Sequence, residues 1–153
     1  MKPSLPITDR SIRFALVGCG RIAISHIEAL RQHAARAELV AVCDPRPEAL
    51  ASAVQRTGAA GFASLEALLS HCDADVIVLA TPSGLHPRQA IAAAQAQRHV
   101  LTEKPMATKW DEGMQMVRAC RDAGVKLFVV KQNRLNPTMQ LLKGAVDAGR
   151  FDF

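Results

Sequence analysis

One short stretch near the N-terminus decides the fold, and it reads Ile12-Arg13-Phe14-Ala15-Leu16-Val17-Gly18-Cys19-Gly20-Arg21-Ile22-Ala23. Its first half, residues 12–17, is mostly apolar, as expected for a strand buried inside a parallel sheet. Residues 22–35 continue with apolar side chains at helical spacing. Two glycines lie between these segments, so the stretch predicts a strand, a tight turn and a helix in succession.

The same alternation of short apolar runs and longer helical segments continues to the end of the chain. Further strands are predicted at 39–43, near Phe62, and at 76–80, 99–102 and 125–130. Further helices are predicted at 48–57, 64–70, 85–96, 108–123 and 137–148. Strands and helices that alternate in this way are joined by right-handed crossovers. The expected fold class is therefore α/β, a doubly wound parallel sheet with helices on both faces.

Composition excludes several other classes of protein. No apolar run approaches the length of a membrane helix, and the polar N-terminus does not resemble a signal peptide, so we expect a cytoplasmic protein without a membrane partner. The net charge of +5 comes from scattered residues, and with no Tyr and one Trp we expect no nucleic-acid partner. The four cysteines form no C-x-x-C pair, so no metal site is expected.

The glycine turn has the residue pattern of a phosphate-binding loop, G-x-G-x-x-A. Gly18 permits the tight turn, Gly20 lets the backbone approach a pyrophosphate, and Ala23 keeps helix and strand close. Arg21 and Ile22 begin the helix, where free N–H groups and the helix dipole favour an anion. This pattern between a strand and a helix predicts a dinucleotide-binding domain of the Rossmann type.

Asp44 ends the second predicted strand, where an acidic residue accepts hydrogen bonds from the adenosine ribose. A carboxylate there repels a 2′-phosphate, so NAD is the expected cofactor rather than NADP. Arg46 weakens this preference, since a guanidinium can hold a phosphate. Two alternatives remain open: Asp44 only starts the turn 44–47, or the domain is a methyltransferase that binds S-adenosylmethionine.

A second group of residues follows the fourth and fifth predicted strands. It consists of Thr81-Pro82-Ser83-Gly84-Leu85-His86 and Glu103-Lys104-Pro105. Ligands of open α/β sheets bind outside the carboxyl ends of the strands, so both segments should face the cofactor. A cis Lys104–Pro105 peptide would aim the Lys104 side chain into the cleft.

Together these motifs, with Arg134-Leu135-Asn136-Pro137, resemble the Gfo/Idh/MocA oxidoreductase family over nearly the whole chain. The resemblance implies that Lys104, the candidate catalytic residue, lies beside the nicotinamide and the reacting sugar carbon. It also implies that Glu103, Thr81 and Pro82 position the cofactor and that His86 lies near the same cleft. Whether Lys104 acts as a neutral base or as a charged stabiliser of the alkoxide stays open.

Residues 130–138 and 140–143 resemble more narrowly the branch of the family that oxidises C3 of UDP-N-acetylglucosaminuronic acid for surface polysaccharide, such as the lipopolysaccharide O-antigen. That resemblance implies a nucleotide-sugar substrate edged by Lys131, Asn133 and Arg134. An oxidoreductase acting on another sugar or an inositol, and a non-catalytic module that binds or senses NAD(H), stay as alternatives.

The resemblance also sets the expected domain boundaries. We expect a tail at 1–10, the dinucleotide-binding domain at 11–135, and at 136–153 a helix leading into a second α/β substrate domain that this chain lacks. In the family branch, the missing half supplies a catalytic His with a nearby Asp and mediates assembly into homo-oligomers. The fragment alone is therefore expected to be inactive.

Overall fold

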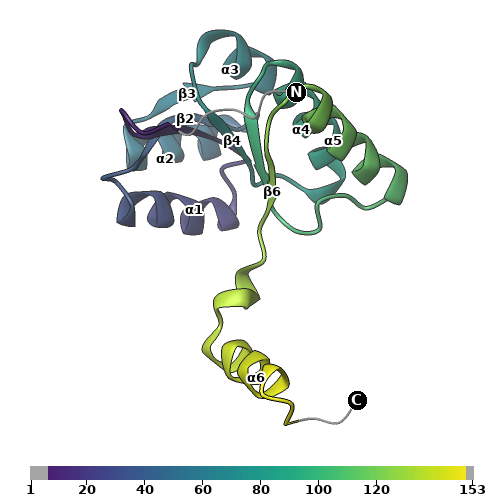
Figure 1. Ribbon diagram of the computed structural model, residues 1–153. Helices are drawn as coiled ribbons and strands as arrows, with labels where there is room; N and C mark the ends of the chain where they lie inside the picture. The colour runs from purple at the N-terminus through teal and green to yellow at the C-terminus, as the bar shows by residue number, and fades with distance from the viewer. Residues whose placement is uncertain (1–6, 151–153) are drawn as a thin grey trace.

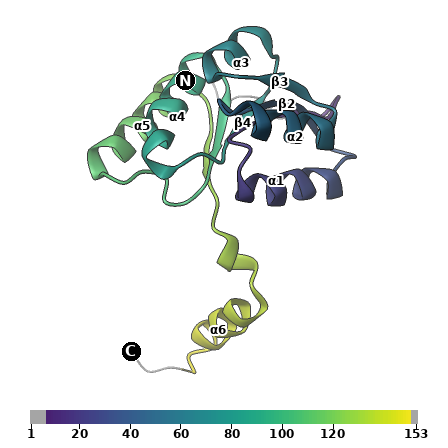
Figure 2. The same cartoon turned by 180° about the vertical axis from the view of Figure 1, so that it is seen from behind.

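The computed structural model describes residues 7–150 and contains one sheet of six parallel strands (Figures 1 and 2). The strands are β1 (Ile12–Val17), β2 (Ala37–Cys43), β3 (Ala60–Phe62), β4 (Val76–Leu79), β5 (His99–Thr102) and β6 (Leu127–Val129). The helices are α1 (Arg21–Gln32), α2 (Pro47–Thr57), α3 (Leu65–His71), α4 (His86–Gln95), α5 (Trp110–Asp122) and α6 (Pro137–Asp147), with 3₁₀ turns η1 (Ser83–Leu85) and η2 (Gln132–Leu135). The predicted α/β class and parallel sheet are confirmed.

The strands lie in the order β3-β2-β1-β4-β5-β6. The chain therefore moves outward from β1 in one direction and then returns to begin the other half at β4. This reversal makes the gap beyond the carboxyl ends of β1 and β4 the place where a doubly wound sheet binds its ligand. Both groups of predicted site residues follow strands that end at this edge.

Alternate side chains of the central strands enter two different cores, as the twofold period of a strand requires. Ala15 and Val17 pack with α3, α4 and α5 on one face of the sheet. Leu16 packs with Ala23 of α1 and Ala53 of α2 on the other face. Because both faces are covered, the inner strands carry the continuous apolar runs that first indicated a parallel sheet.

Helix ends follow local chemistry with small differences from the predicted limits. The Ser64 hydroxyl accepts the Ala67 N–H at 3.1 Å, so Ser64 is the N-cap of α3. Gly124 lies just beyond α5 with a φ of 71°, a left-handed conformation that is typical of a glycine at the end of a helix. The helix α5 begins at Trp110 rather than 108 because Lys109 is extended.

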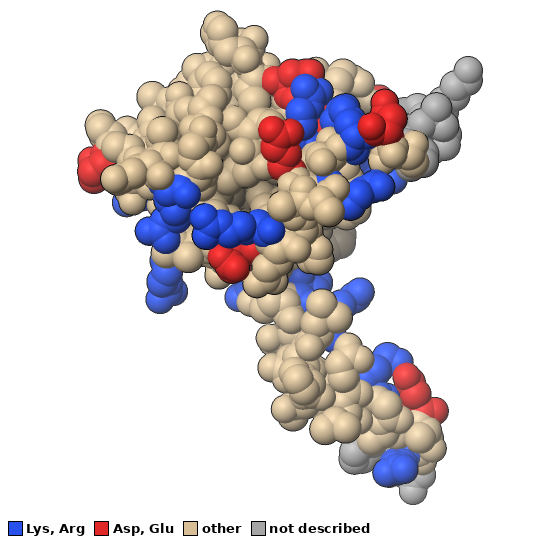
Figure 3. Space-filling view, turned by 90° about the vertical axis from the view of Figure 1, so that its left-hand side faces the viewer, with Lys and Arg blue, Asp and Glu red and all other residues tan. Residues whose placement is uncertain are grey.

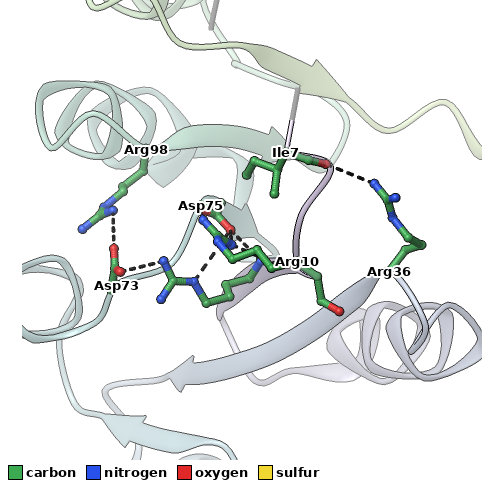
Figure 4. A network of polar contacts seen from close by, with 8 residues as sticks. Ile7, Arg10, Arg36, Asp73, Asp75 and Arg98 are labelled. Carbon is green, nitrogen blue, oxygen red and sulfur yellow. Dashed lines mark hydrogen bonds and ion pairs between the residues drawn. The ribbon is translucent and has the colours of Figure 1, made fainter. Parts of the chain in front are cut away.

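An ionic network joins the N-terminal segment to the opposite edge of the sheet from the ligand side (Figure 4). The Arg10 guanidinium donates to both carboxylate oxygens of Asp75, at 2.6 and 2.8 Å, and the Arg13 N–H donates to the same carboxylate at 2.7 Å. Asp73 pairs with Arg13 and Arg98. Residues 7–10 of the predicted tail are thus held against the domain, whereas residues 1–6 lie outside the described residues.

The last helix lies away from the sheet, beyond the ligand edge (Figure 1). It contacts η2, and its apolar side chains are exposed, with Leu141 at 76% and Leu135 of η2 at 85%. An amphipathic helix normally buries such a face against another element. Residues 151–153, the end of the segment predicted to lead into a second domain, lie outside the described residues.

Candidate functional site

The first glycine of the turn is required by the backbone. Gly18 has a φ of +94°, and a Cβ at this position would lie 2.7 Å from the carbonyl oxygen of Ala80. The Gly18 N–H donates to the Cys43 carbonyl at 2.7 Å, so the turn is held between β1, β2 and the end of β4. A side chain at Gly18 would separate these strand ends, which line the ligand edge.

At the second glycine, by contrast, the space beside the backbone is open. A Cβ on Gly20 would meet nothing within 4 Å, so this face of the turn is free for a ligand to approach. Gly20 is the N-cap of α1 and offers no side chain to the helix, while Arg21 and Ile22 are exposed in the first turn. Unpaired N–H groups and the helix dipole therefore point at the space above Gly20, which suits a pyrophosphate.

Asp44 is buried at the end of β2 and accepts four hydrogen bonds. Cys19 N–H and Arg46 N–H donate at 2.9 Å each, and the Arg46 guanidinium donates twice at 3.1 Å. Burial by itself raises the pKa of Asp44, but the hydrogen bonds from Arg46 and Cys19 outweigh it and lower that pKa below 3.8. Asp44 is therefore ionised, and it both starts the 44–47 turn and faces the cleft.

A cleft of about 800 Å³ runs along the switch point of the sheet. It is lined on one side by Gly18, Gly20 and Asp44, and on the other by Thr81 and Pro82. Side chains from α3 and α4, both apolar and charged, complete its walls: Leu65, Glu66, Arg88, Gln89 and Ala92. An open glycine turn and a buried carboxylate in one cleft match the pyrophosphate and ribose of a dinucleotide.

Thr81 and His86 have structural partners at the edge of this cleft. The Thr81 hydroxyl donates to the Gln89 side chain at 2.5 Å. The His86 ring is fully buried, with Nε2 2.8 Å from the Thr81 carbonyl and Nδ1 3.1 Å from the Pro105 carbonyl. His86 is not among the residues that line the cleft, so its direct contact with a cofactor stays a prediction. The His86 ring links the two motif segments, 81–86 and 103–105, through these two contacts.

The Glu103-Lys104-Pro105 turn is also held from α1. His26 Nε2 lies 2.9 Å from Glu103 Oε1, and the other Glu103 oxygen accepts the Lys104 N–H at 3.3 Å. The Lys104–Pro105 peptide is cis, the isomer considered as a hypothesis from the sequence. His26 is not among the predicted site residues, because nothing in its local sequence pattern shows that α1 reaches the end of β5.

A second cavity, of about 840 Å³, brings Lys104 together with the predicted substrate residues. Its lining residues, from the E-K-P turn, η2 and α6, are Lys104, Lys131, Gln132, Asn133, Arg134, Met139, Gln140 and Lys143. Gln140 and Lys143 were missed as site residues, although they lie three residues apart on one helix face. Lys104 itself is exposed in this chain.

Other kinds of site find no support in the described residues. Within residues 7–150 there is no group of three or more His, Cys, Asp or Glu side chains that could hold a metal. No helix in this range is long and apolar enough to cross a membrane. On the face shown in Figure 3, Lys and Arg form separate groups with Asp and Glu beside them, rather than one basic surface.

A protein-family model matches residues 12–131, and it describes an oxidoreductase family with an NAD-binding Rossmann fold. Among solved structures, the WlbA dehydrogenase of Bordetella pertussis, in complex with NADH and UDP-GlcNAcA, is 63% identical with a TM-score of 0.92 over 95% of this chain. The WlbA dehydrogenase of Chromobacterium violaceum, in complex with the same two ligands, is 60% identical with a TM-score of 0.94 over 99% of this chain.

A curated relative extends the likeness to polyol dehydrogenases. Inositol 2-dehydrogenase of Mycolicibacterium smegmatis is 33% identical over 92% of this chain. The chain spans 41–43% of the length of these three relatives. The match to an NAD-binding fold removes the methyltransferase alternative, and the cofactor prediction of NAD is confirmed.

Proposed function

Since the chain belongs to the Gfo/Idh/MocA oxidoreductase family and forms its NAD-binding Rossmann domain, we propose that the whole protein oxidises the C3 hydroxyl of UDP-GlcNAcA. The observation that carries this proposal is the second cavity, where Lys104 shares the lining with Lys131, Asn133 and Arg134. A uronate sugar joined to a diphosphate is strongly anionic, so it suits a cavity rich in cationic side chains. The likeness to two dehydrogenases solved with NADH and UDP-GlcNAcA supports the same substrate.

In this proposal the two cavities bind different ligands. The cleft along β1 and β4 holds NAD through Gly18, Gly20, Arg21, Ile22 and Asp44. NAD, when bound, supplies the nicotinamide that accepts a hydride from the sugar carbon. The substrate cavity holds the anionic sugar nucleotide and places its hydroxyl near the turn that joins the two sites.

Lys104 is the proposed catalytic residue at that junction. Its Nζ either takes the hydroxyl proton or remains charged and stabilises the alkoxide as it forms. Lys104 is exposed in the described part of the chain. A neutral Lys104 that acts as the base depends on burial, and this burial has to come from elsewhere in the whole protein. Until it is buried, Lys104 is better suited to stabilise negative charge.

The backbone that carries Lys104 is positioned from two sides. His26 holds the carboxylate of the preceding residue, Glu103, and His86 holds the carbonyl of the following residue, Pro105. Through the Thr81 carbonyl, His86 also ties this turn to the cofactor cleft. We infer that Glu103, Thr81, Pro82 and His86 set the relative position of cofactor and Lys104, because catalysis of hydride transfer depends strongly on alignment.

The biological setting follows from the substrate. We propose that the protein acts in the cytoplasm, in the supply of a nucleotide sugar for surface polysaccharide such as lipopolysaccharide, and that it works as a homo-oligomer. The exposed apolar side chains of η2 and α6, Leu135 and Leu141 among them, support further burial in the whole protein. The 153-residue chain alone is expected to bind NAD without measurable turnover.

The experiment is to incubate the whole protein with NAD and UDP-GlcNAcA and to follow NADH by its absorbance. We expect NADH to form, and Lys104→Met to abolish most of the rate while NADH binding to the variant stays unchanged. The matched control is Lys109→Met, an exposed lysine outside both cavities, which should leave the rate unchanged. Turnover with inositol but not with UDP-GlcNAcA would refute the proposed substrate.

A further inference from the structure

The helix α5 carries an exposed apolar stripe that belongs to neither cavity. One side of α5 packs against the sheet and α4 through Met116 and Cys120, which are buried. Another side presents Trp110, which is 80% exposed, and Val117, which is 42% exposed. Met114 lies between them and is half-buried. Because these three residues are four and three positions apart, they form one continuous stripe along the helix.

The stripe faces away from the rest of the described chain. Figures 1 and 2 show α5 on the outer side of the domain, while α6 lies beyond the ligand edge and away from it. Apolar stripes on helices normally pack against another protein surface, and large exposed ones mark sites of association. An indole as exposed as that of Trp110 is the kind of side chain that dominates such contacts.

Two charges of opposite sign flank the stripe. Asp111 and Arg118 are exposed, and within residues 7–150 neither of them has an ion-pair partner. They are seven residues apart, which is close to two full turns, so they lie on the same side of the stripe. A rise of about 1.5 Å per residue separates them by about 10 Å along the helix, so they cannot pair with each other.

A second copy of α5, packed antiparallel against the first, supplies a partner for each of these groups. A twofold axis near the middle of the stripe brings Asp111 of each copy to Arg118 of the other. The apolar side chains of the two stripes then pack between these two ion pairs.

The ends of the stripe match in the same way. The twofold axis places Trp110 of one copy near Arg121 of the other, where a guanidinium over the indole face adds a cation–π contact. Arg121 is otherwise paired only with the adjacent Asp122, in an exposed ion pair that contributes little. The stripe and its charges are therefore complementary to themselves.

We propose that this face of α5 is an interface between two copies of the chain, which associate through it as a twofold dimer. The occupant is a second copy, because opposite charges at similar distances from the centre of a stripe are what a twofold interface requires. One helix from each copy makes a small contact, so the dimer formed by this face alone is weak. This deepens the proposed function, and it rests on that proposal only for the setting of the homo-oligomer.

The test is sedimentation equilibrium of the chain over a range of concentrations, without NAD or sugar nucleotide. Wild type should show a monomer–dimer equilibrium with a dissociation constant below about 1 mM. Trp110→Ala should weaken dimerisation roughly 10- to 100-fold, as for a central aromatic residue of an interface. Asp111→Arg and Arg118→Asp should each weaken it as well, because each variant places like charges opposite one another twice. An equal mixture of these two variants should form a heterodimer, in which both ion pairs are restored.

Matched controls separate this contact from general effects of charge and from the apolar face of α6. Glu28→Arg and Arg31→Asp make the same charge changes at exposed positions of α1 and should leave dimerisation unchanged, as should Leu141→Glu on α6.

The proposal is overturned if wild type stays monomeric up to about 1 mM, or if the two charge variants fail to form a heterodimer when mixed. It is also overturned if Leu141→Glu dissociates the dimer while Trp110→Ala does not. Because no cofactor or substrate is present, the result is independent of the test of dehydrogenase activity: NADH formation by the whole protein would stand even if this association failed.

Discussion

The two glycines of the phosphate-binding turn should respond in opposite ways to the same substitution. At Gly18, alanine would have to adopt a φ of +94°, and its Cβ would lie 2.7–3.0 Å from three backbone atoms of Ala80 and Thr81. Left-handed backbone costs an L-residue about 1–2 kcal/mol. Crowding against atoms that cannot rotate away adds about 1–3 kcal/mol. Less entropy in the unfolded chain returns about 0.4–1 kcal/mol.

Gly18→Ala should therefore lower the free energy of unfolding by roughly 2–4 kcal/mol, a large part of the 5–15 kcal/mol typical of a domain. Gly20→Ala is the matched control, because its backbone has a φ of −80° and its Cβ would meet nothing within 4 Å. The small entropic gain and the poorer helix cap nearly cancel there, so stability should change by less than about 1 kcal/mol. Gly20→Ala should instead weaken NADH binding, since the new methyl group occupies the approach to the pyrophosphate.

The assay combines urea unfolding of each variant with a fluorescence titration with NADH. A stability loss confined to Gly18→Ala, together with a binding loss in folded Gly20→Ala, would support the separate roles of the two glycines. If Gly18→Ala were as stable as wild type, the tight packing of the turn against the end of β4 would be wrong. If Gly20→Ala bound NADH normally, the dinucleotide would not pass over this face of the turn.

Three further predictions concern ionisation and buried polar groups. The hydrogen bonds from Arg10 lower the pKa of Asp75 below 3.8, so the contribution of Asp75 to stability is present above that pH and is lost as the pH falls through the lowered pKa. In Asp75→Asn, the free energy of unfolding, measured as a function of pH, should therefore depend less on pH below about pH 4 than it does in wild type. Replacing His86 by Leu removes the ring that lies between the Thr81 and Pro105 carbonyls, so at least one of these carbonyls loses its donor, and the free energy of unfolding in urea should fall by about 1–3 kcal/mol; an unchanged midpoint would contradict this role of His86. Burial, with the nearby Asp44, raises the pKa of the Cys19 thiol to about 11, so alkylation of Cys19, mapped by mass spectrometry, should be slow at neutral pH and accelerate only in strong alkali.

Most of the fold could be predicted because its determinants are local. The apolar runs of β1 and β4, the cap at Ser64 and the left-handed glycine at Gly124 are all decided within a few residues of chain. The short strand β3 was the faintest prediction, since it spans only Ala60–Phe62 and pairs with one neighbour. Helix limits differed where one extended residue, Lys109, delays the first turn.

The candidate site could likewise be predicted only in part. Motifs located Gly18, Gly20, Asp44, Thr81 and Lys104, because each follows a strand that ends at the ligand edge. They could not show that an arginine two residues beyond Asp44 covers its carboxylate, since both the turn and the rotamer are needed to bring the guanidinium to 3.1 Å. Nor could they show what lies opposite each motif across the sheet edge.

The sequence by itself determined the order of strands and helices, the glycine turn between β1 and α1, and the residue types at the ends of β2, β4 and β5. These depend on period, turn chemistry and spacing, which act over short distances along the chain. Only the tertiary structure decided that His26 meets Glu103 and that His86 joins the carbonyls of Thr81 and Pro105. Those pairs are separated by up to 77 residues, and they form because parallel strands bring their carboxyl ends to one edge while the crossovers place α1 and α4 beside it.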